Sequence, residues 1–141
     1  MADLEALIRL KRHTVEERQK ILAEIFRQVE VVEYRKKELL ERLDKERKAL
    51  DENLNIETSA YYGRFEGVIR SNVEVLDGEL RKLETRVQIA QEEVREAFAD
   101  MKRVEIVHKR RQEEEAQEIK NKESQEMDEI GIEGFMRKEE F

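Results

Sequence analysis

The side chains best suited to metal binding in this sequence are its two histidines, His13 and His108. Imidazole is a common zinc ligand, but a protein metal site normally needs three or four donor groups. His13 falls at an outward position of the helical repeat described below, whereas His108 falls at an inward one, and no further ligands accompany them. The absence of cysteine removes thiolate sites, disulfides and thiol nucleophiles as well. We therefore expect neither a metal site nor a bound cofactor.

Three consecutive carboxylates, Glu113 to Glu115, are the other group that could do chemistry. Carboxylates act as general acids or bases where a pocket encloses them and shifts their pKa values. Nothing in the surrounding sequence predicts such a pocket, and the chain has no glycine-rich loop that would hold a nucleotide phosphate. We interpret the run as a solvated helix face and expect a protein that is not an enzyme.

The composition limits the kind of fold that can carry these side chains. The 141 residues include 28 basic and 35 acidic side chains and no proline, and 38% are hydrophobic. This balance suffices for a narrow apolar stripe but scarcely for a thick core. No run of 18 apolar residues exists and the amino terminus lacks an apolar segment, so we expect a soluble, cytoplasmic chain without a membrane span or signal peptide.

The negative charge of the chain is concentrated near its carboxyl end. Residues 113–141 carry eleven acidic and four basic side chains, whereas the residues before them carry equal numbers of each. A nucleic-acid-binding protein normally has a clear cationic segment. The charge distribution therefore argues against nucleic acid as a partner.

Two runs of apolar residues repeat with alternating spacings of three and four, which define the a and d seam of a coiled coil. The first run consists of Ile8, Val15, Leu22, Val29, Lys36, Leu43 and Leu50, with companions Leu4, Lys11, Arg18, Ile25, Val32, Leu39 and Glu46. The second run consists of Val73, Leu80, Val87, Val94, Met101 and His108, with companions Ile69, Leu76, Leu83, Ala90, Ala97, Val104 and Arg111. Each run predicts one long amphipathic helix.

The segment between the two runs has the composition of a turn. It contains two asparagines and the glycines Gly63 and Gly67, and Ser59 has the side chain of a helix N-cap. Folding back here buries each seam against the other, in layers such as Leu43 with Leu76. The alternative, a continuous rod that dimerises in parallel, would place both glycines inside a helix.

The predicted fold is therefore all-α, a long two-helix antiparallel coiled-coil hairpin with a short non-heptad C-terminal tail, which forms a single unit over residues 1–141. The expected bounds are a first helix over about 4–55, a turn over about 56–64, a second helix over about 65–126 and the tail over about 127–141.

Basic residues occupy the seam end where the two chain termini should meet. They can extend outward and pair with acidic neighbours such as Glu16 and Glu17. Alternatively, they form an electrostatic docking surface for a partner protein. The candidates for this partner site are Arg9, Lys11, Arg12, Arg18, Lys109, Arg110 and Arg111.

The last residues carry a short motif. Met127, Asp128 and Glu129 are followed by Met136 and Arg137, and this ending closely resembles that of the FliJ family, small stalk proteins of the flagellar type III export apparatus. The opening from Leu4 to Glu17, with its Leu-x-x-Leu-Ile-Arg-Leu-Lys-Arg, is similar to the start of that family. The length and the two-run architecture also resemble those of the family.

The resemblance implies a non-enzymatic stalk component of flagellum biogenesis, and thus a role in protein transport, motility and chemotaxis. FliJ-like proteins bind the hexameric export ATPase, contact the cytoplasmic domain of the export gate protein and assist export chaperones. By this likeness the terminal, basic end would enter the ATPase ring. The protein would be cytoplasmic and peripheral to the inner membrane at the flagellar base, associated with the membrane only through partners.

The family's export-gate contacts lie on the half of the hairpin near the turn. The positions that match them here are Leu39, Leu43, Leu50, Ile69, Val73 and Leu76. A further contact of the family is aromatic, but Glu46 stands at the matching position. The heptad pattern also assigns these positions to the buried seam.

Two other functions remain open from the residues alone. A prefoldin-like holdase chaperone also uses helical hairpins, although it inserts a β-hairpin between them, for which the break here is short. A generic scaffold rod would share every feature except the terminal motif.

Overall fold

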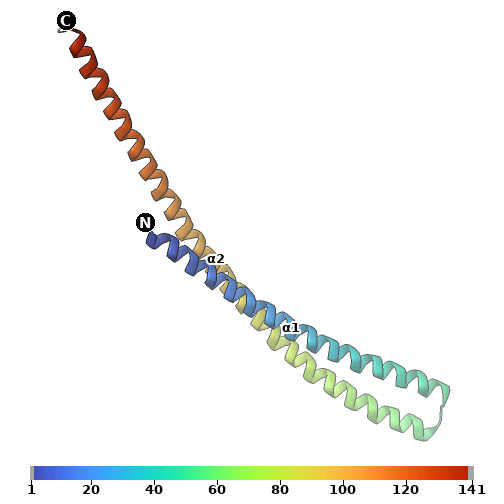
Figure 1. Ribbon diagram of the computed structural model, residues 1–141. Helices are drawn as coiled ribbons and strands as arrows, with labels where there is room; N and C mark the ends of the chain where they lie inside the picture. The colour runs from blue at the N-terminus through green and yellow to red at the C-terminus, as the bar shows by residue number, and fades with distance from the viewer. Residues whose placement is uncertain (1, 140–141) are drawn as a thin grey trace. The chain divides into compact units, whose positions relative to one another are not determined.

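The computed structural model describes residues 2–139 and consists of two long helices, α1 (Ala2–Glu52) and α2 (Ile56–Glu139), with no strand in that range (Figure 1). Met1 and the last two residues of the expected tail, 140 and 141, lie outside the described residues. The predicted all-α antiparallel two-helix hairpin is confirmed.

The turn between the helices is shorter than the predicted turn and lies before it. It comprises only Asn53, Leu54 and Asn55, and residues 56–64 are already helical. Asn55, rather than Ser59, caps α2: its Oδ1 accepts a hydrogen bond from the Thr58 backbone N–H at 2.8 Å, and its own N–H donates to Thr58 Oγ1 at 3.1 Å. This reciprocal pair is a capping box that satisfies two otherwise free donors. The Thr58 hydroxyl also donates to the Asn53 carbonyl at 2.7 Å, which ties the turn to the first turn of α2.

The glycines that suggested a turn lie inside α2. Gly63 and Gly67 are exposed and helical, and no glycine in the described part of the chain has a positive φ. A Cβ built on either would meet nothing within 4 Å. Each costs a helix only its propensity, about 1 kcal/mol, which seam burial elsewhere offsets.

The expected non-heptad tail is also helical, because α2 continues to Glu139. Gly131 and Gly134 do not interrupt it, since most of their neighbours are good helix formers such as glutamate, lysine and methionine. Arg137 and Lys138 lie in the last turn, where positive charge interacts favourably with the helix dipole.

The chain divides into two compact units, which are described one by one. We call Thr14–Ala97 the hairpin unit and residues 2–13 with 98–139 the terminal unit. The single unit expected over residues 1–141 stays a prediction.

In the hairpin unit α1 and α2 lie side by side (Figure 1), and the buried residues occupy predicted seam positions. Its most buried positions include Ile69 and Ala90, each only 3% exposed. The other buried hydrophobic residues of this unit are Val15, Val32, Leu43, Leu83 and Ala97. Small alanines on α2 leave room for larger side chains of α1, as interdigitating packing requires.

Two charged pairs join α1 to α2 along the seam of the hairpin unit. Lys36 Nζ lies 2.7 Å from Asp77 Oδ1, and Arg18 Nη1 lies 3.4 Å from Glu93 Oε2. Lys36 and Arg18 both occupy seam positions of the first heptad run. The predicted layer of Leu43 with Leu76 would instead place Lys36 beside residue 83. Each residue of α1 therefore lies beside a residue of α2 that is at least one helical turn nearer to the start of α2 than predicted. The three-residue turn explains this shift.

In the terminal unit the start of α1 lies beside α2 over a short stretch. Met101 is buried here, and Leu7 and Ile8 are half-buried. From Lys109 to Glu139 every residue of α2 is exposed. We call residues 109–139 the bare helix.

Candidate functional site: the basic end and the bare helix

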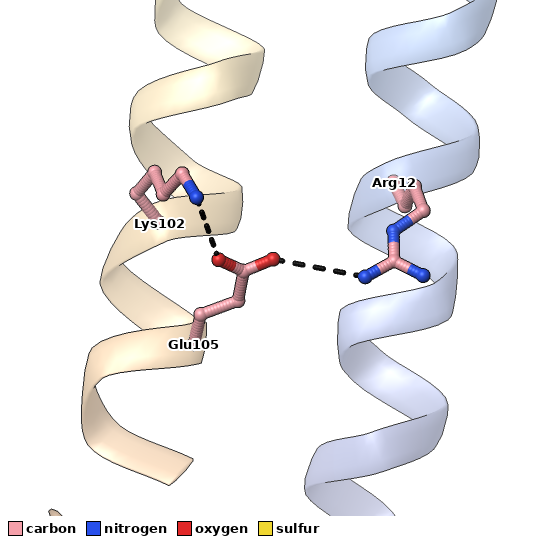
Figure 2. A network of polar contacts seen from close by, with 3 residues as sticks. All are labelled: Arg12, Lys102 and Glu105. Carbon is pink, nitrogen blue, oxygen red and sulfur yellow. Dashed lines mark hydrogen bonds and ion pairs between the residues drawn. The ribbon is translucent and has the colours of Figure 1, made fainter. Parts of the chain in front are cut away.

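A three-residue charge network closes the start of α1 against α2 in the terminal unit (Figure 2). Glu105 is half-buried and its two carboxylate oxygens receive different cations: Lys102 Nζ lies 3.0 Å from Oε2, and Arg12 Nη2 lies 3.8 Å from Oε1. Lys102 Nζ also lies 5.3 Å from the centre of the Phe98 ring, a distance at which a cation is attracted to an aromatic face. Both pairs are partly exposed to solvent, so they orient side chains more than they stabilise the fold.

The predicted basic residues separate into paired and unpaired groups. Arg12 pairs with Glu105 in the terminal unit, and Arg18 pairs with Glu93 in the hairpin unit. Arg9 is exposed and Lys11 is half-buried. The remaining three, Lys109, Arg110 and Arg111, are exposed and form no ion pair with any residue in the described range. Pairing with acidic residues therefore accounts for Arg12 and Arg18, and the docking surface stays a prediction for the other basic residues.

The acidic partners Glu93 and Glu105 were not predicted from the sequence. Both flank the seam rather than lie on it, at the positions that coiled coils use for ion pairs between helices. That flanking position was the signal available in the sequence, but which cation each one meets depends on the register of the two helices.

His108 marks the last partly buried residue before the bare helix. Its side chain is 15% exposed, its Nδ1 is buried without a hydrogen-bond partner, and its Nε2 lies 3.9 Å from Glu5 Oε1. In residues 2–139 no group of three or more histidine, aspartate or glutamate side chains is placed to hold a metal ion. His108 thus closes the seam as an inward-facing ring, as its heptad position predicted.

The bare helix begins directly after His108, the last half-buried residue of α2. It starts with the three unpaired cations, and the residues after them, 113–139, carry ten acidic and four basic side chains. The motif residues Met127, Asp128, Glu129, Met136 and Arg137 are all exposed on it. Large apolar side chains are exposed as well, namely Ile119, Met127, Ile130, Ile132, Phe135 and Met136.

The six positions that match the family's export-gate contacts lie in the hairpin unit with unequal exposure. Leu43 and Ile69 are buried, whereas Leu39, Leu50, Val73 and Leu76 are half-buried. Leu39 and Leu76 line an open hollow between α1 and α2. A partner in this hollow would contact the exposed parts of Leu39 and Leu76. Leu43 and Ile69 are instead buried in the seam.

These features define a two-helix coiled-coil protein whose distinctive surfaces are helix faces. Neither of the two helices is long and apolar enough over any stretch of residues 2–139 to cross a membrane. Compared with known families, the chain matches the model described as the flagellar FliJ protein over residues 1–140, and it belongs to the FliJ family. It is thus a flagellar export-related protein. No curated protein and no solved structure matches it significantly.

Proposed function

We propose that this chain is a non-enzymatic stalk component of the flagellar type III export apparatus that binds the hexameric export ATPase through its basic end. Membership of the FliJ family is the reason for proposing the flagellar export apparatus. The observation that carries the ATPase contact is the run of Lys109, Arg110 and Arg111, exposed and without an ion pair in the described residues, at the start of the bare helix. Cations without an acidic partner among residues 2–139 can meet acidic groups of another protein.

The other basic candidates contribute less directly. Arg9 and Lys11 lie in the same unit as the unpaired run, whereas Arg12 is held by Glu105. Arg18 belongs to the hairpin unit and is held by Glu93. We therefore assign the main electrostatic contact to Lys109, Arg110 and Arg111, with Arg9 and Lys11 as its neighbours on α1.

The test is the hydrolysis rate of the purified export ATPase with and without the full chain. Arg110→Glu with Arg111→Glu should weaken binding and abolish stimulation. The matched control is Arg64→Glu with Arg81→Glu, which reverses two exposed arginines of the same helix in the hairpin unit and should leave stimulation unchanged. Absence of binding by the unaltered chain, or equal effects of the two double variants, would eliminate this contact.

We further propose that the chain binds the cytoplasmic domain of the export gate protein with the half of the hairpin near the turn. The hollow lined by Leu39 and Leu76 supports this contact, because its apolar edges are open to solvent. Leu39→Ala with Leu76→Ala should reduce binding in a pull-down with the gate domain. Leu43 and Ile69 are unsuitable for this test, since they are buried and their substitution destabilises the seam.

Assistance to export chaperones is the third part of the proposal, and exposed helix faces are the surfaces that would serve it. The turn bears on the prefoldin-like alternative: the three residues 53–55 leave no room for a β-hairpin between the helices. An export chaperone that failed to bind the full chain in any assay would remove this part of the proposal and leave the ATPase contact intact.

A further inference from the structure

A second apolar stripe runs along the outer side of α2 in the hairpin unit. Tyr61, Val68, Val75 and Ile89 follow one another at multiples of seven residues, and Lys82 occupies the one interruption. These four apolar side chains are between 57% and 62% exposed, so they take no part in the seam between α1 and α2. A heptad-spaced stripe on one helix face is the pattern that accepts a further helix.

Part of this stripe borders a groove between α1 and α2. Two open hollows form it, and they adjoin at Arg35, which lines both. The apolar floor of the groove consists of Val31, Val32, Leu39, Val75, Leu76 and Leu83. We call this feature the outer groove.

The rim of the outer groove is predominantly basic. Six cations line it, namely Arg27, Arg35, Arg42, Lys45, Lys82 and Arg86, against four acids, Glu24, Glu38, Glu41 and Glu79. Glu38 is in addition engaged by Tyr34, and the hydrogen bond between them is the main reason that the pKa of Tyr34 is raised above its ordinary value. An apolar floor with a basic rim suits an amphipathic helix with acidic flanks.

The bare helix of this chain has the complementary chemistry. Its residues 113–139 carry ten acidic and four basic side chains and are exposed throughout. Ile119, Met127 and Ile130 lie at spacings of eight and three, which places them on one side of the helix. Glu115 and Glu126 flank that side, eleven residues apart.

The lengths of groove and helix also agree. The outer groove extends along α1 from Glu24 to Lys45, which is roughly 33 Å at 1.5 Å per residue. Residues 113–139 span roughly 40 Å on the same basis. Because one side of the groove and residues 113–139 belong to the same unbroken helix α2, and a helix cannot pack along itself, a second copy must supply the occupant.

We propose that the outer groove of one copy binds the acidic helix of residues 113–139 of a second copy, and that two copies do so reciprocally. A reciprocal exchange is a closed, two-fold symmetric arrangement, so it ends at the dimer. The contact is charge-assisted, because the rim carries an excess of cations and the helix an excess of carboxylates. This inference does not depend on the proposed ATPase contact, whereas the gate domain and the second copy would compete for the hollow lined by Leu39 and Leu76, which is part of the outer groove.

The experiment is sedimentation velocity of the full chain from micromolar to millimolar concentration, at low and at high salt. The unaltered chain should show a monomer–dimer equilibrium that shifts toward monomer as salt screens the contact. Arg35→Glu with Arg86→Glu reverses the charge of two cations that line the groove, and Glu115→Lys with Glu126→Lys reverses the two carboxylates beside the apolar side of the helix. Each double variant alone should weaken the dimer by about tenfold or more.

Mixing the two double variants gives the sharpest result. Within the mixture the reversed groove residues of one variant face the reversed carboxylate positions of the other, so heterodimers should form at concentrations at which neither variant dimerises alone. The control, Lys37→Glu with Arg81→Glu, changes two basic residues that do not line the groove and should dimerise like the unaltered chain. Circular dichroism of every variant checks that the helices are retained.

Three outcomes overturn the proposal. The unaltered chain is monomeric at every concentration, or its dimer is insensitive to both reversals, or the mixture stays monomeric. A dimer that is insensitive to both reversals would assign self-association to a different surface.

Discussion

The helix α2 contributes both to the seam of the hairpin unit and to the bare helix, yet different interactions stabilise it in the two regions. In the hairpin unit, residues such as Ile69 and Ala90 are almost entirely buried against the other helix. In the bare helix, apolar side chains such as Ile130 and Phe135 are exposed by more than half. The first region gains its stability from burial, whereas the second relies on local propensity and charge.

This difference teaches where the chain is committed to its own fold and where it offers surface to others. Apolar groups that face their own chain contribute to folding, while those left in water contribute only when a partner covers them. The same substitution should therefore have different consequences in the two regions. In the seam it should lower the stability of the fold, and in the bare helix it should weaken the binding of a partner.

The largest contrast is expected from removing a branched side chain. Ile69→Ala leaves a cavity in the seam and should lower the free energy of unfolding by about 2–5 kcal/mol. Ile130→Ala removes the same atoms from an exposed site and should change it by less than about 0.5 kcal/mol. Urea denaturation followed by circular dichroism measures both, and similar losses would mean that the bare helix is buried in solution.

Replacing an alanine by a larger side chain compares how closely the seam and the bare helix are packed. Ala90 is 3% exposed, so Ala90→Leu overfills the seam and should cost about 1–3 kcal/mol. Ala116→Leu in the bare helix should be neutral within about 0.5 kcal/mol. Thermal unfolding of both variants is the check, and a stable Ala90→Leu chain would contradict the close packing at this layer.

The turn provides a test of intermediate size. Asn55→Ala removes the side chain that caps α2 and should cost about 1 kcal/mol. Asn121→Ala, which breaks only the hydrogen bond with Gln117 inside the bare helix, serves as the control and should change the midpoint of urea unfolding hardly at all. Equal midpoints for the two variants would remove Asn55 from the account of the turn.

The smallest effects come from glycines inside α2. A Cβ at Gly63 or Gly131 meets nothing within 4 Å, so replacement by alanine should favour the helix by up to about 1 kcal/mol at either site. Gly63→Ala should raise the global stability, whereas Gly131→Ala should only slow amide hydrogen exchange near residue 131. A rise in global stability from Gly131→Ala would show that the bare helix unfolds together with the seam.

The heptad pattern predicted the core well because burial follows directly from spacing. All eight buried hydrophobic residues, from Val15 on α1 to Met101 on α2, occupy predicted seam positions. The turn was misplaced because glycine indicates turns in general, but Gly63 and Gly67 sit on an exposed helix face that tolerates them. The signal that mattered was the Asn-x-x-Thr of Asn55 and Thr58, whose reciprocal hydrogen bonds begin α2.

The pairing of the basic residues was beyond the sequence for a related reason. Which acid meets Arg12 or Arg18 is decided by the register, and the register follows from the length of the turn. The basic end as a region was recognisable from composition. Which of its basic residues form an ion pair could be determined only from the structure, because it depends on how the two helices lie side by side.

The charged pairs of Lys36 with Asp77 and Arg18 with Glu93 have a mechanical consequence. Sliding one helix past the other by a single turn, about 5.4 Å, would leave Lys36 and Arg18 on an apolar seam without their partners. The two pairs therefore oppose longitudinal shear of the hairpin unit, by a modest amount because both are partly exposed to solvent.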